Sequence, residues 1–158
     1  MSEFLYGHWA VMEALRAGRR SFEQLLLADA VEEKGMVGRI VEAAQGRGVH
    51  IQRVSRRILD DLANGGNHQS TVLRVGPYPY ADLDDLFTLA DQRGEKPFLL
   101  ILDLLKDPQN VGTLLRVADA VGVHGVVIQE RRGVSVTPAV VNASSGAVEY
   151  LQVAQVTN

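Results

Sequence analysis

Residues 107–123, DPQNVGTLLRVADAVGV, decide the fold of the second half of the chain. The sequence Asp-Pro-Gln-Asn is typical of a turn, and apolar side chains then recur at helical spacing as far as Val121. We expect Asn110 to cap this helix through its side-chain oxygen. The predicted apolar stripe, which should face a sheet, consists of Val111, Leu114, Leu115, Ala118 and Val121. Arg116 lies on nearly the opposite side, where its neighbours Gly112, Thr113 and Ala120 are small enough to let a backbone or a ligand approach.

The segments on either side predict a parallel sheet. Residues 98–102 form a continuous apolar run, which suits a strand buried on both faces, and residues 125–128 form the next strand. The intervening helix makes this a right-handed βαβ unit, so the turn before Asn110 lies at the carboxyl end of a strand, where open α/β sheets place their sites. A helical stretch at 140–145 and a strand from 150 to 156 should follow. From the residues alone, a capped helix with one solvated arginine is the commoner interpretation of Arg116.

The first half predicts a smaller αβ block with helices at 8–17, 31–47 and 56–63 and strands at 22–28, 49–54 and 71–75. Trp9 should be a core residue of the first helix, and Ser55 should cap the third. Gly76-Pro77-Tyr78-Pro79-Tyr80 marks a boundary, and a helix over 82–92 follows with Leu83, Leu86 and Leu89 inward. We therefore expect an α/β protein with a domain at 1–76, a linker and helix at 77–95, and a second domain from residue 96 to residue 158.

Composition excludes several classes of protein. With no cysteine, the chain has no disulfide, thiolate zinc site or cysteine nucleophile, and its four histidines show no metal-ligand spacing. No run approaches the ~20 apolar residues that span a bilayer, and no secretory signal is apparent, so we expect a cytoplasmic protein without a membrane partner. The formal net charge is −3, with 10 Lys/Arg against 9 Asp/Glu in residues 1–75 and 6 against 10 in residues 76–158. Charge alone does not indicate a nucleic-acid partner.

Some polar residues of the first half are candidates for RNA contact. His68 and Gln69 follow Asn67 and two glycines that let a backbone approach closely, and their side chains can hydrogen-bond to or stack on bases. A purely structural polar loop explains these residues equally well. His8 beside Trp9 and the basic pair Arg56-Arg57 are further candidates, although a solvated basic pair is the commoner interpretation.

Three motifs carry a resemblance to a known family. The pattern Asp-Pro-x-Asn-x-Gly-x-x-x-Arg-x-Ala-Asp-Ala-x-Gly-Val at 107–123 resembles the first signature motif of the SpoU/TrmH family of RNA 2′-O-ribose methyltransferases, within the SPOUT superfamily. Residues 140–149, VVNASSGAVE, are similar to the Ser-x-Gly-Ala segment of that family. Residues 6–15 and 66–69 resemble its substrate-binding domain. The matches run in order along essentially the whole chain.

The resemblance implies transfer of a methyl group from S-adenosylmethionine to a ribose 2′-hydroxyl, with Arg116 as the key catalytic residue and Asn110 supporting it. Because guanidinium does not deprotonate in proteins, Arg116 should hold a phosphate and stabilise charge on the 2′-oxygen rather than act as a base. The residues that we expect to contact RNA are His8, Arg56, Arg57, Asn67, His68 and Gln69. The implied substrate is a guanosine of large-subunit rRNA, with tRNA as an alternative, and the implied full-length enzyme is a homodimer with a SPOUT-type trefoil knot.

Two carboxy-terminal motifs of the family, an Asn/Ser-Glu-x-x-Gly loop and a Ser-Leu-Asn-Val-Ser-Val helix start, do not occur in these residues. Since they build the knot and most of the donor pocket, we expect the residues that bind S-adenosylmethionine to lie beyond Asn158. Residues 1–158 should then be the amino-terminal part of a longer enzyme and be inactive alone. The alternative is a non-catalytic RNA-binding protein that uses the first domain. A weaker alternative is a fragment that dimerises through an unpaired sheet edge.

Overall fold

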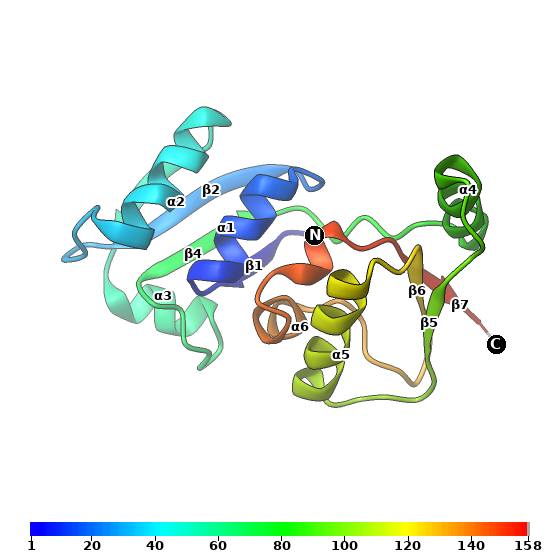
Figure 1. Cartoon of the computed structure of the whole chain (residues 1–158). Helices are drawn as coiled ribbons and strands as arrows, with labels where there is room; N and C mark the ends of the chain where they lie inside the picture. Colours follow the sequence, from blue (N-terminus) through cyan, green and yellow to red (C-terminus); the bar gives the residue numbers. More distant parts are fainter. Residues whose placement is uncertain (158) are drawn as a thin grey trace. The chain divides into compact units, whose positions relative to one another are not determined.

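The computed structural model describes residues 1–157 and divides the chain into two compact units, Met1–Tyr78 and a second unit that begins at Pro79 (Figure 1). The first unit contains β1 (Glu3–Tyr6), α1 (His8–Ala17), β2 (Phe22–Ala28), α2 (Gly35–Gly46), β3 (His50–Val54), α3 (Arg56–Leu62) and β4 (Thr71–Val75). The second contains α4 (Leu83–Arg93), β5 (Leu99–Leu102), α5 (Pro108–Val121), β6 (Gly125–Gln129), α6 (Pro138–Ala143), a 3-10 turn (Ala147–Tyr150) and β7 (Val153–Val156). The predicted α/β class is confirmed.

Asn158, the residue beyond which the sequence analysis placed the donor-binding motifs, lies outside the described residues. That expectation therefore stays a prediction. The strand that precedes Asn158 is shorter than predicted, because residues 147–150 form the 3-10 turn and β7 begins only at Val153.

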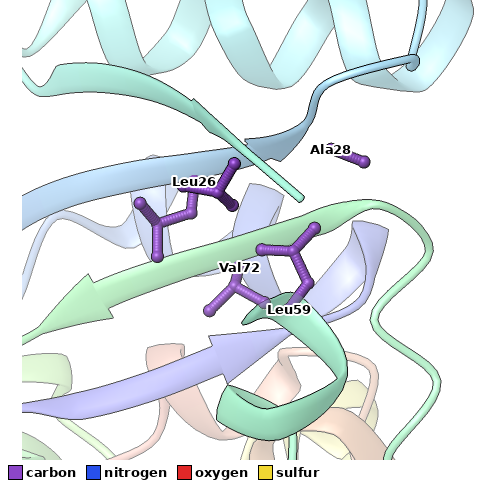
Figure 2. Close-up of a cluster of buried hydrophobic side chains, with 5 residues drawn as sticks. Leu26, Ala28, Leu59 and Val72 are labelled. Atoms are coloured by element: carbon purple, nitrogen blue, oxygen red, sulfur yellow. The ribbon is translucent and has the colours of Figure 1, made fainter. Parts of the chain in front are cut away.

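The first unit is built on a sheet with strand order β1-β4-β2-β3, in which β2 and β3 are parallel and the other pairs are antiparallel. Side chains alternate along β2, so Leu26 and Ala28 face one side together with Val72 of β4 and Leu59 of α3 (Figure 2). Leu25 and Leu27 are fully buried on the other side, which α1 and α2 cover. The sheet therefore has a core on each face.

The second helix begins later than residue 31, where the sequence predicted its start. Lys34 is extended, and Gly35 has a φ of 54°, a left-handed conformation that a helix cannot pass through. The segment before it is instead a loop that Arg53 organises, because its guanidinium donates to the carbonyls of Ala28, Asp29 and Val31 at 3.3, 3.0 and 2.9 Å. Arg53, a charged residue within β3, thus has a structural role: it holds this loop through three backbone carbonyls.

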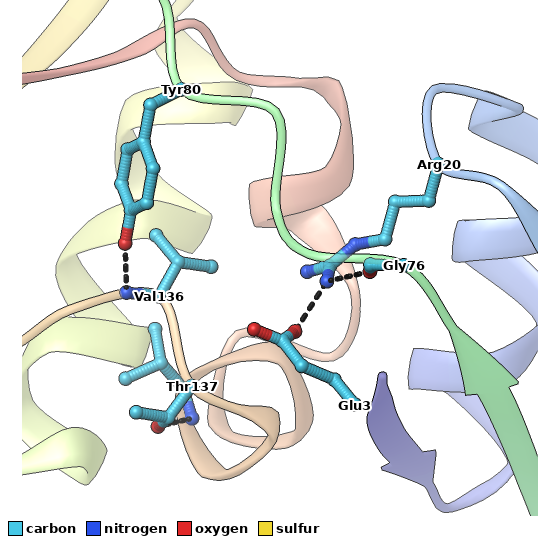
Figure 3. A network of polar contacts seen from close by, with 7 residues as sticks. Glu3, Arg20, Gly76, Tyr80, Val136 and Thr137 are labelled. Atoms are coloured by element: carbon cyan, nitrogen blue, oxygen red, sulfur yellow. Dashed lines mark hydrogen bonds and ion pairs between the residues drawn. The ribbon is translucent and has the colours of Figure 1, made fainter. Parts of the chain in front are cut away.

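A buried arginine ties together the ends of three strands in the first unit. Arg20, just before β2, places its Nη1 2.5 Å from Oε2 of Glu3 in β1 and 3.2 Å from the carbonyl of Gly76 after β4 (Figure 3). The Arg20 side chain is fully buried, whereas that of Glu3 is 27% exposed. Its guanidinium also lies 5.1 Å from the centre of the Tyr78 ring. Arg20 therefore fixes the position of residues 76–78, where the chain leaves this unit.

The second unit is built on a parallel sheet with strand order β5-β6-β7, as the βαβ pattern predicted. Leu86 of α4 packs on this sheet with Val127 and Ala154. A Cβ at Gly125 would lie 2.1 Å from Cγ of Leu86, so the close approach of α4 requires glycine there. Two expectations were wrong: Leu83 is 39% exposed, and β5 is an edge strand whose Ile101 is 70% exposed rather than buried.

Helix α5 packs against α6 through Gly112, where a Cβ would lie 2.4 Å from the Cβ of Ala143. This contact turns the buried face of α5 away from the predicted stripe. Leu114 and Val121 are 36% and 55% exposed, and the buried positions are Val111, Gly112, Leu115 and Ala118. The predicted stripe was therefore wrong at two positions. Periodicity alone does not reveal that α6 also packs against α5, at Gly112.

Buried and half-buried polar groups fix the loops of the second unit. The Tyr80 hydroxyl accepts the Val136 N–H at 2.8 Å, and the Thr137 hydroxyl caps α6 by accepting the Val140 N–H at 3.4 Å (Figure 3). His124 is 2% exposed; its Nδ1 accepts the Phe98 N–H at 2.9 Å, and its Nε2 lies 2.7 Å from a carboxylate oxygen of Glu95. A side-chain hydrogen bond between the residues that precede β5 and β6 thus adds to the backbone hydrogen bonds between these strands.

Candidate functional site

Helix α5 begins at Pro108, after a five-residue loop that follows the carboxyl end of β5, and its first turn is capped differently from the prediction. Asp107 is the N-cap, since its Oδ2 accepts the Asn110 N–H at 2.9 Å, and Pro108 occupies the first helical position. Asn110 is therefore not the cap. Its side chain is exposed and has no hydrogen bond within residues 1–157, so it remains available to a ligand.

Arg116 lies six residues further along α5, which corresponds to about 9 Å along the helix axis. Its side chain is exposed and has no ion pair or hydrogen bond within the described part of the chain. Together with Thr113, Val117 and Ala120 it lines a shallow hollow of about 260 Å³. A permanently charged, planar guanidinium beside small neighbours is suited to a phosphate or a developing oxyanion.

The carboxyl ends of the parallel strands offer one further polar group. Gln129 ends β6, and its Oε1 is buried without a hydrogen-bond partner in residues 1–157. An unsatisfied buried acceptor costs about 1–3 kcal/mol, so a ligand with an N–H or O–H donor would be stabilised here. The neighbouring apolar pocket, lined by residues such as Ile128, Val136 and Val140, encloses about 10 Å³. This is far below the roughly 300–1,000 Å³ of small-molecule sites. The residues that line this pocket therefore do not by themselves enclose a site for a small molecule.

The segment that resembled the Ser-x-Gly-Ala motif has a tightly turned backbone. Ser144 is fully buried; its hydroxyl donates to the Val141 carbonyl at 3.0 Å and accepts the Val148 N–H at 3.4 Å. Ser145 and Gly146 both have positive φ, 53° and 81°. The backbone of Ala143 and Ser144 closes on Gly112, so this segment supports the position of α5.

In the first unit, the structure gives His68 a structural role. It is 4% exposed, its Nε2 lies 2.9 Å from Oδ1 of Asp60, and its Nδ1 accepts the Ser70 N–H at 3.0 Å. The ring therefore holds the loop between α3 and β4 in place and presents no free edge. Of the two interpretations that the sequence left open for His68, the buried structural one applies.

His8 and Gln69 join the start of α1 to this loop. The Gln69 side-chain oxygen accepts the His8 N–H at 2.8 Å, and Nε2 of His8 lies 2.9 Å from the Gln69 carbonyl. Gln69 and Ser70 have positive φ, 49° and 66°, and a Cβ at Gly66 would overlap the Tyr6 ring. Burial raises the pKa of the Tyr6 hydroxyl above its ordinary value. The loop is thus rigidly seated on the rest of the unit.

Exposed groups remain around this loop. Asn67 and Gln69 are exposed, as are Arg56 and Arg57 at the start of α3. Trp9, predicted to be a core residue, is 52% exposed, because α1 buries its Ala10, Val11 and Met12 side instead. Ser55 stands at the N-cap position of α3 without a side-chain cap hydrogen bond. The structure therefore brings His8, His68 and Gln69 together and leaves an aromatic ring beside them.

The comparisons with known proteins concern both units. Residues 4–81 match the model for RNA 2′-O ribose methyltransferase substrate binding, and residues 97–158 match the model for the SpoU rRNA Methylase family. The chain belongs to the SpoU/TrmH family of RNA methyltransferases. The resemblance on which the sequence analysis relied is thereby confirmed.

Relatives of this SpoU/TrmH chain are longer than it is. YacO of Bacillus subtilis, assigned to the TrmH family of tRNA/rRNA methyltransferases, is 44% identical over 156 residues, which cover 99% of this chain and 61% of that relative. A TrmH-family protein of Staphylococcus aureus is 38% identical over 154 residues, again covering 61% of its length. The chain thus spans about three-fifths of the curated relatives it matches.

Solved structures show the same SpoU fold at lower identity. An rRNA methyltransferase from Sinorhizobium meliloti with bound AdoMet superposes with a TM-score of 0.69 at 23% identity, covering 98% of this chain and 54% of that one. The SpoU methyltransferase AviRb from Streptomyces viridochromogenes superposes with a TM-score of 0.73 at 22% identity, covering 98% and 53%. These likenesses establish the fold, including the parallel sheet of the second unit.

Sequence reasoning missed three structural features of this SpoU chain. Asp107 was readable as the cap from the Asp-Pro start of the helix, a pattern that favours a cap followed by proline at the first position. The buried acceptor of Gln129 and the exposure of Trp9 had no sequence signal. Within residues 1–157 no helix is long and apolar enough to cross a bilayer, and no group of three or more acidic or histidine side chains forms a metal site.

Proposed function

We propose that the protein to which this chain belongs transfers a methyl group from S-adenosylmethionine to a ribose 2′-hydroxyl of RNA. The observation that carries the proposal is Arg116, which is exposed and without a partner on α5, the helix that follows β5 of the parallel sheet in a SpoU-family unit. An exposed guanidinium without an internal partner is available to a substrate phosphate or a developing oxyanion.

Arg116 would act on the acceptor rather than on the donor. The 2′-hydroxyl of ribose is a poor nucleophile until negative charge develops on its oxygen. Since guanidinium keeps its proton, Arg116 holds an adjacent phosphate through its two-pronged N–H groups and stabilises that charge electrostatically. Asn110, about 1.7 turns earlier on the same helix, supplies an amide that can position the ribose. S-adenosylmethionine supplies the electrophilic methyl group when it is bound.

The first unit would bind the RNA. Its exposed Trp9, Asn67 and Gln69 lie around a loop that is internally rigid, which suits recognition of unpaired nucleotides by stacking and base-edge hydrogen bonds. Within that class we propose rRNA rather than tRNA, and a guanosine of the large subunit, on the likeness of the Gly-Asn-His-Gln loop to relatives that act there. We further propose a homodimeric, cytoplasmic enzyme.

These 158 residues would not be sufficient for methyl transfer. The two carboxy-terminal motifs that the resemblance leads us to expect do not occur in them, and the pocket beside Gln129 is too small to enclose the donor. A chimera tests the proposal directly: residues 1–158 replace the matching part of YacO, which supplies the rest of the enzyme. Transfer of a radiolabelled methyl group to ribosomal RNA, located at the 2′-oxygen by resistance to alkaline hydrolysis, is the expected result.

The matched variants of the chimera are Arg116→Ala and Arg116→Lys, with Arg93→Ala as the control at the exposed end of α4. The proposal expects loss of transfer in the first, loss of most transfer in the second because lysine lacks the planar fork, and full activity in the control. Full activity in Arg116→Ala would refute the assigned role. No transfer by the parent chimera, with intact folding, would refute the enzyme proposal.

A second candidate is a non-catalytic RNA-binding protein that uses the first unit. The exposed Trp9 and amides favour it, since they need no methyl donor to bind RNA. RNA binding by the chimera without any methyl transfer would support this candidate over the enzyme.

A further inference from the structure

A polar cleft of about 530 Å³ opens in the first unit at the carboxyl ends of the parallel strands β2 and β3. Its size falls within the roughly 300–1,000 Å³ of sites that hold small molecules. Ala28, which closes the core cluster shown in Figure 2, forms part of its wall. The lining residues are Ala28, Asp29, Ala30, Val31, Glu32, Ser55, Arg56 and Ser70. No residue of the proposed transfer site is among them.

The cleft combines two carboxylates with one guanidinium. Among the lining residues, Asp29 and Glu32 carry carboxylate acceptors, and Arg56 carries N–H donors and a positive charge. Glu32 pairs with Lys34 at 2.7 Å, but both side chains are more than two-thirds exposed, so that pair is weak and does not remove Glu32 from the cleft. Two acceptors alone would repel a nucleic-acid strand. Carboxylates and a guanidinium lining one cleft match a nucleotide, which presents base N–H donors and a phosphate together.

Hydrogen bonds to the backbone hold the residues that line the cleft in place. Arg53 donates to the carbonyls of Ala28, Asp29 and Val31, and it pairs with Glu33 at 2.7 Å. The loop that carries Asp29 and Glu32 is therefore anchored by one side chain. On the opposite wall, Ser70 is fixed because its N–H donates to Nδ1 of the buried His68. A preformed cleft loses little conformational entropy on binding.

Trp9 is connected to a lining residue of the cleft through two neighbouring residues that are hydrogen-bonded to each other. Ser70 lines the cleft, and Gln69, the preceding residue, is bonded twice to His8 at the start of α1. Trp9 follows His8 and is 52% exposed. An exposed aromatic ring can stack one base of an RNA strand while a polar cleft holds another.

We propose that this cleft seats one unpaired RNA nucleotide, preferably guanosine, whose neighbouring base stacks on Trp9. Guanine presents adjacent N1–H and N2–H donors that one carboxylate accepts together, whereas uracil presents a single N–H. Asp29 and Glu32 therefore read the base, and Arg56 contacts the phosphate. The inference rests on the proposed RNA function and adds the recognised nucleotide and the residues that recognise it.

The test measures binding of the 158-residue chain to fluorescein-labelled ten-nucleotide RNAs by anisotropy. The probes are oligouridine, the same strand with one central guanosine, and the deoxy version of the latter. We expect the guanosine to raise affinity several-fold. Asp29→Asn should abolish that preference, Arg56→Ala should weaken binding of both RNAs and reduce the salt slope by about one, and Trp9→Ala should weaken both by about five-fold or more. Arg39→Ala, an exposed arginine of α2, is the matched control.

Several results would overturn the inference. They are absence of binding to all probes, a guanosine preference that persists in Asp29→Asn, or equal effects of Arg56→Ala and Arg39→Ala. Unchanged circular dichroism and melting temperature show that each variant folds. Because methyl transfer by the chimera is measured separately, transfer with no effect of the cleft variants rejects the cleft and keeps the enzyme. Cleft-dependent binding without transfer does the reverse.

Discussion

The loop between α3 and β4 and the first turns of α5 both combine a helix end with polar residues, yet they use those residues in opposite ways. In the loop, His68 is buried between Asp60 and the Ser70 N–H, and Gln69 is bonded to His8. On α5, Asn110 and Arg116 are exposed and have no partners within residues 1–157. The same kinds of polar residue therefore stabilise the fold in the loop and stay available to a ligand on α5.

Arg116→Ala should have the largest effect of all the variants. It should lower the rate of methyl transfer and leave stability nearly unchanged. Removing a group that stabilises transition-state charge costs about 2.7–4 kcal/mol, so methyl transfer by the chimera should fall about 100- to 1,000-fold. Stability should change by less than about 0.5 kcal/mol, because the side chain is exposed and without a partner. Single-turnover methylation and urea unfolding measure the two quantities. A loss of stability comparable to that of a core variant would show that Arg116 is structural.

Gly112→Val probes the scaffold that holds Arg116. A Cβ there would lie 2.4 Å from Cβ of Ala143 and 2.8 Å from the Ser144 nitrogen, so the substitution forces α5 and α6 apart. We expect a loss of about 1–3 kcal/mol or more in the free energy of unfolding. Gly46→Ala is the control, since nothing lies within 4 Å of a Cβ at that helical position; it should be neutral or stabilise slightly. Equal effects would refute the close-packing account.

His68→Ala tests the loop side of the comparison. The substitution removes the acceptor of the Ser70 N–H and the partner of Asp60, which should cost about 1–3 kcal/mol of stability. Asn67→Ala, an exposed neighbour, should cost less than about 0.5 kcal/mol. Chemical denaturation of the 158-residue chain measures both. If the His68 variant were as stable as the parent, the ring would not hold the loop.

The smallest expected effect concerns Tyr6, which lies beneath Gly66 of the same loop. Its pKa is raised in the folded state by burial, so the folded protein keeps the hydroxyl proton more firmly than the unfolded chain does. The associated stability is fully present below pH 10 and is lost as the pH rises from 10 through the folded-state pKa. Tyr6→Phe should flatten this loss. A parent and a variant with parallel stability curves above about pH 10 would contradict the assignment.

Much of the fold was predictable because the strands and most helices have clear periodicity. The predicted strands at 22–28 and 71–75 and the helix at 8–17 have the observed bounds. The helix predicted at 31–47 is present, but it starts four residues late at Gly35, because residues 29–34 form a loop whose carbonyls at Asp29 and Val31 accept hydrogen bonds from Arg53, a tertiary effect. Ile101 was misjudged because an apolar run does not reveal whether its strand lies at an edge.

The candidate site was predictable only as a set of residues. The helical face of Arg116, with Thr113 and Ala120 beside it, followed from spacing alone. The division of the loop residues did not, because His68 and Gln69 are adjacent and equally polar, and only the position of Asp60 decides which one is buried. Trp9 was assigned to the core since tryptophan at a helix start commonly packs inward, whereas α1 packs through its next three residues.

The two buried imidazoles, His68 in the first unit and His124 in the second, have the same hydrogen-bond pattern. Each Nδ1 accepts a backbone N–H, from Ser70 and Phe98 respectively, and each Nε2 faces a carboxylate. An imidazole nitrogen that accepts a hydrogen bond carries no proton, so both rings are fixed as the Nε2–H tautomer. Their ¹⁵N resonances would therefore be well separated within each ring and would collapse toward an exchange average when the surrounding structure opens. Each unit thus carries its own spectroscopic reporter of local unfolding.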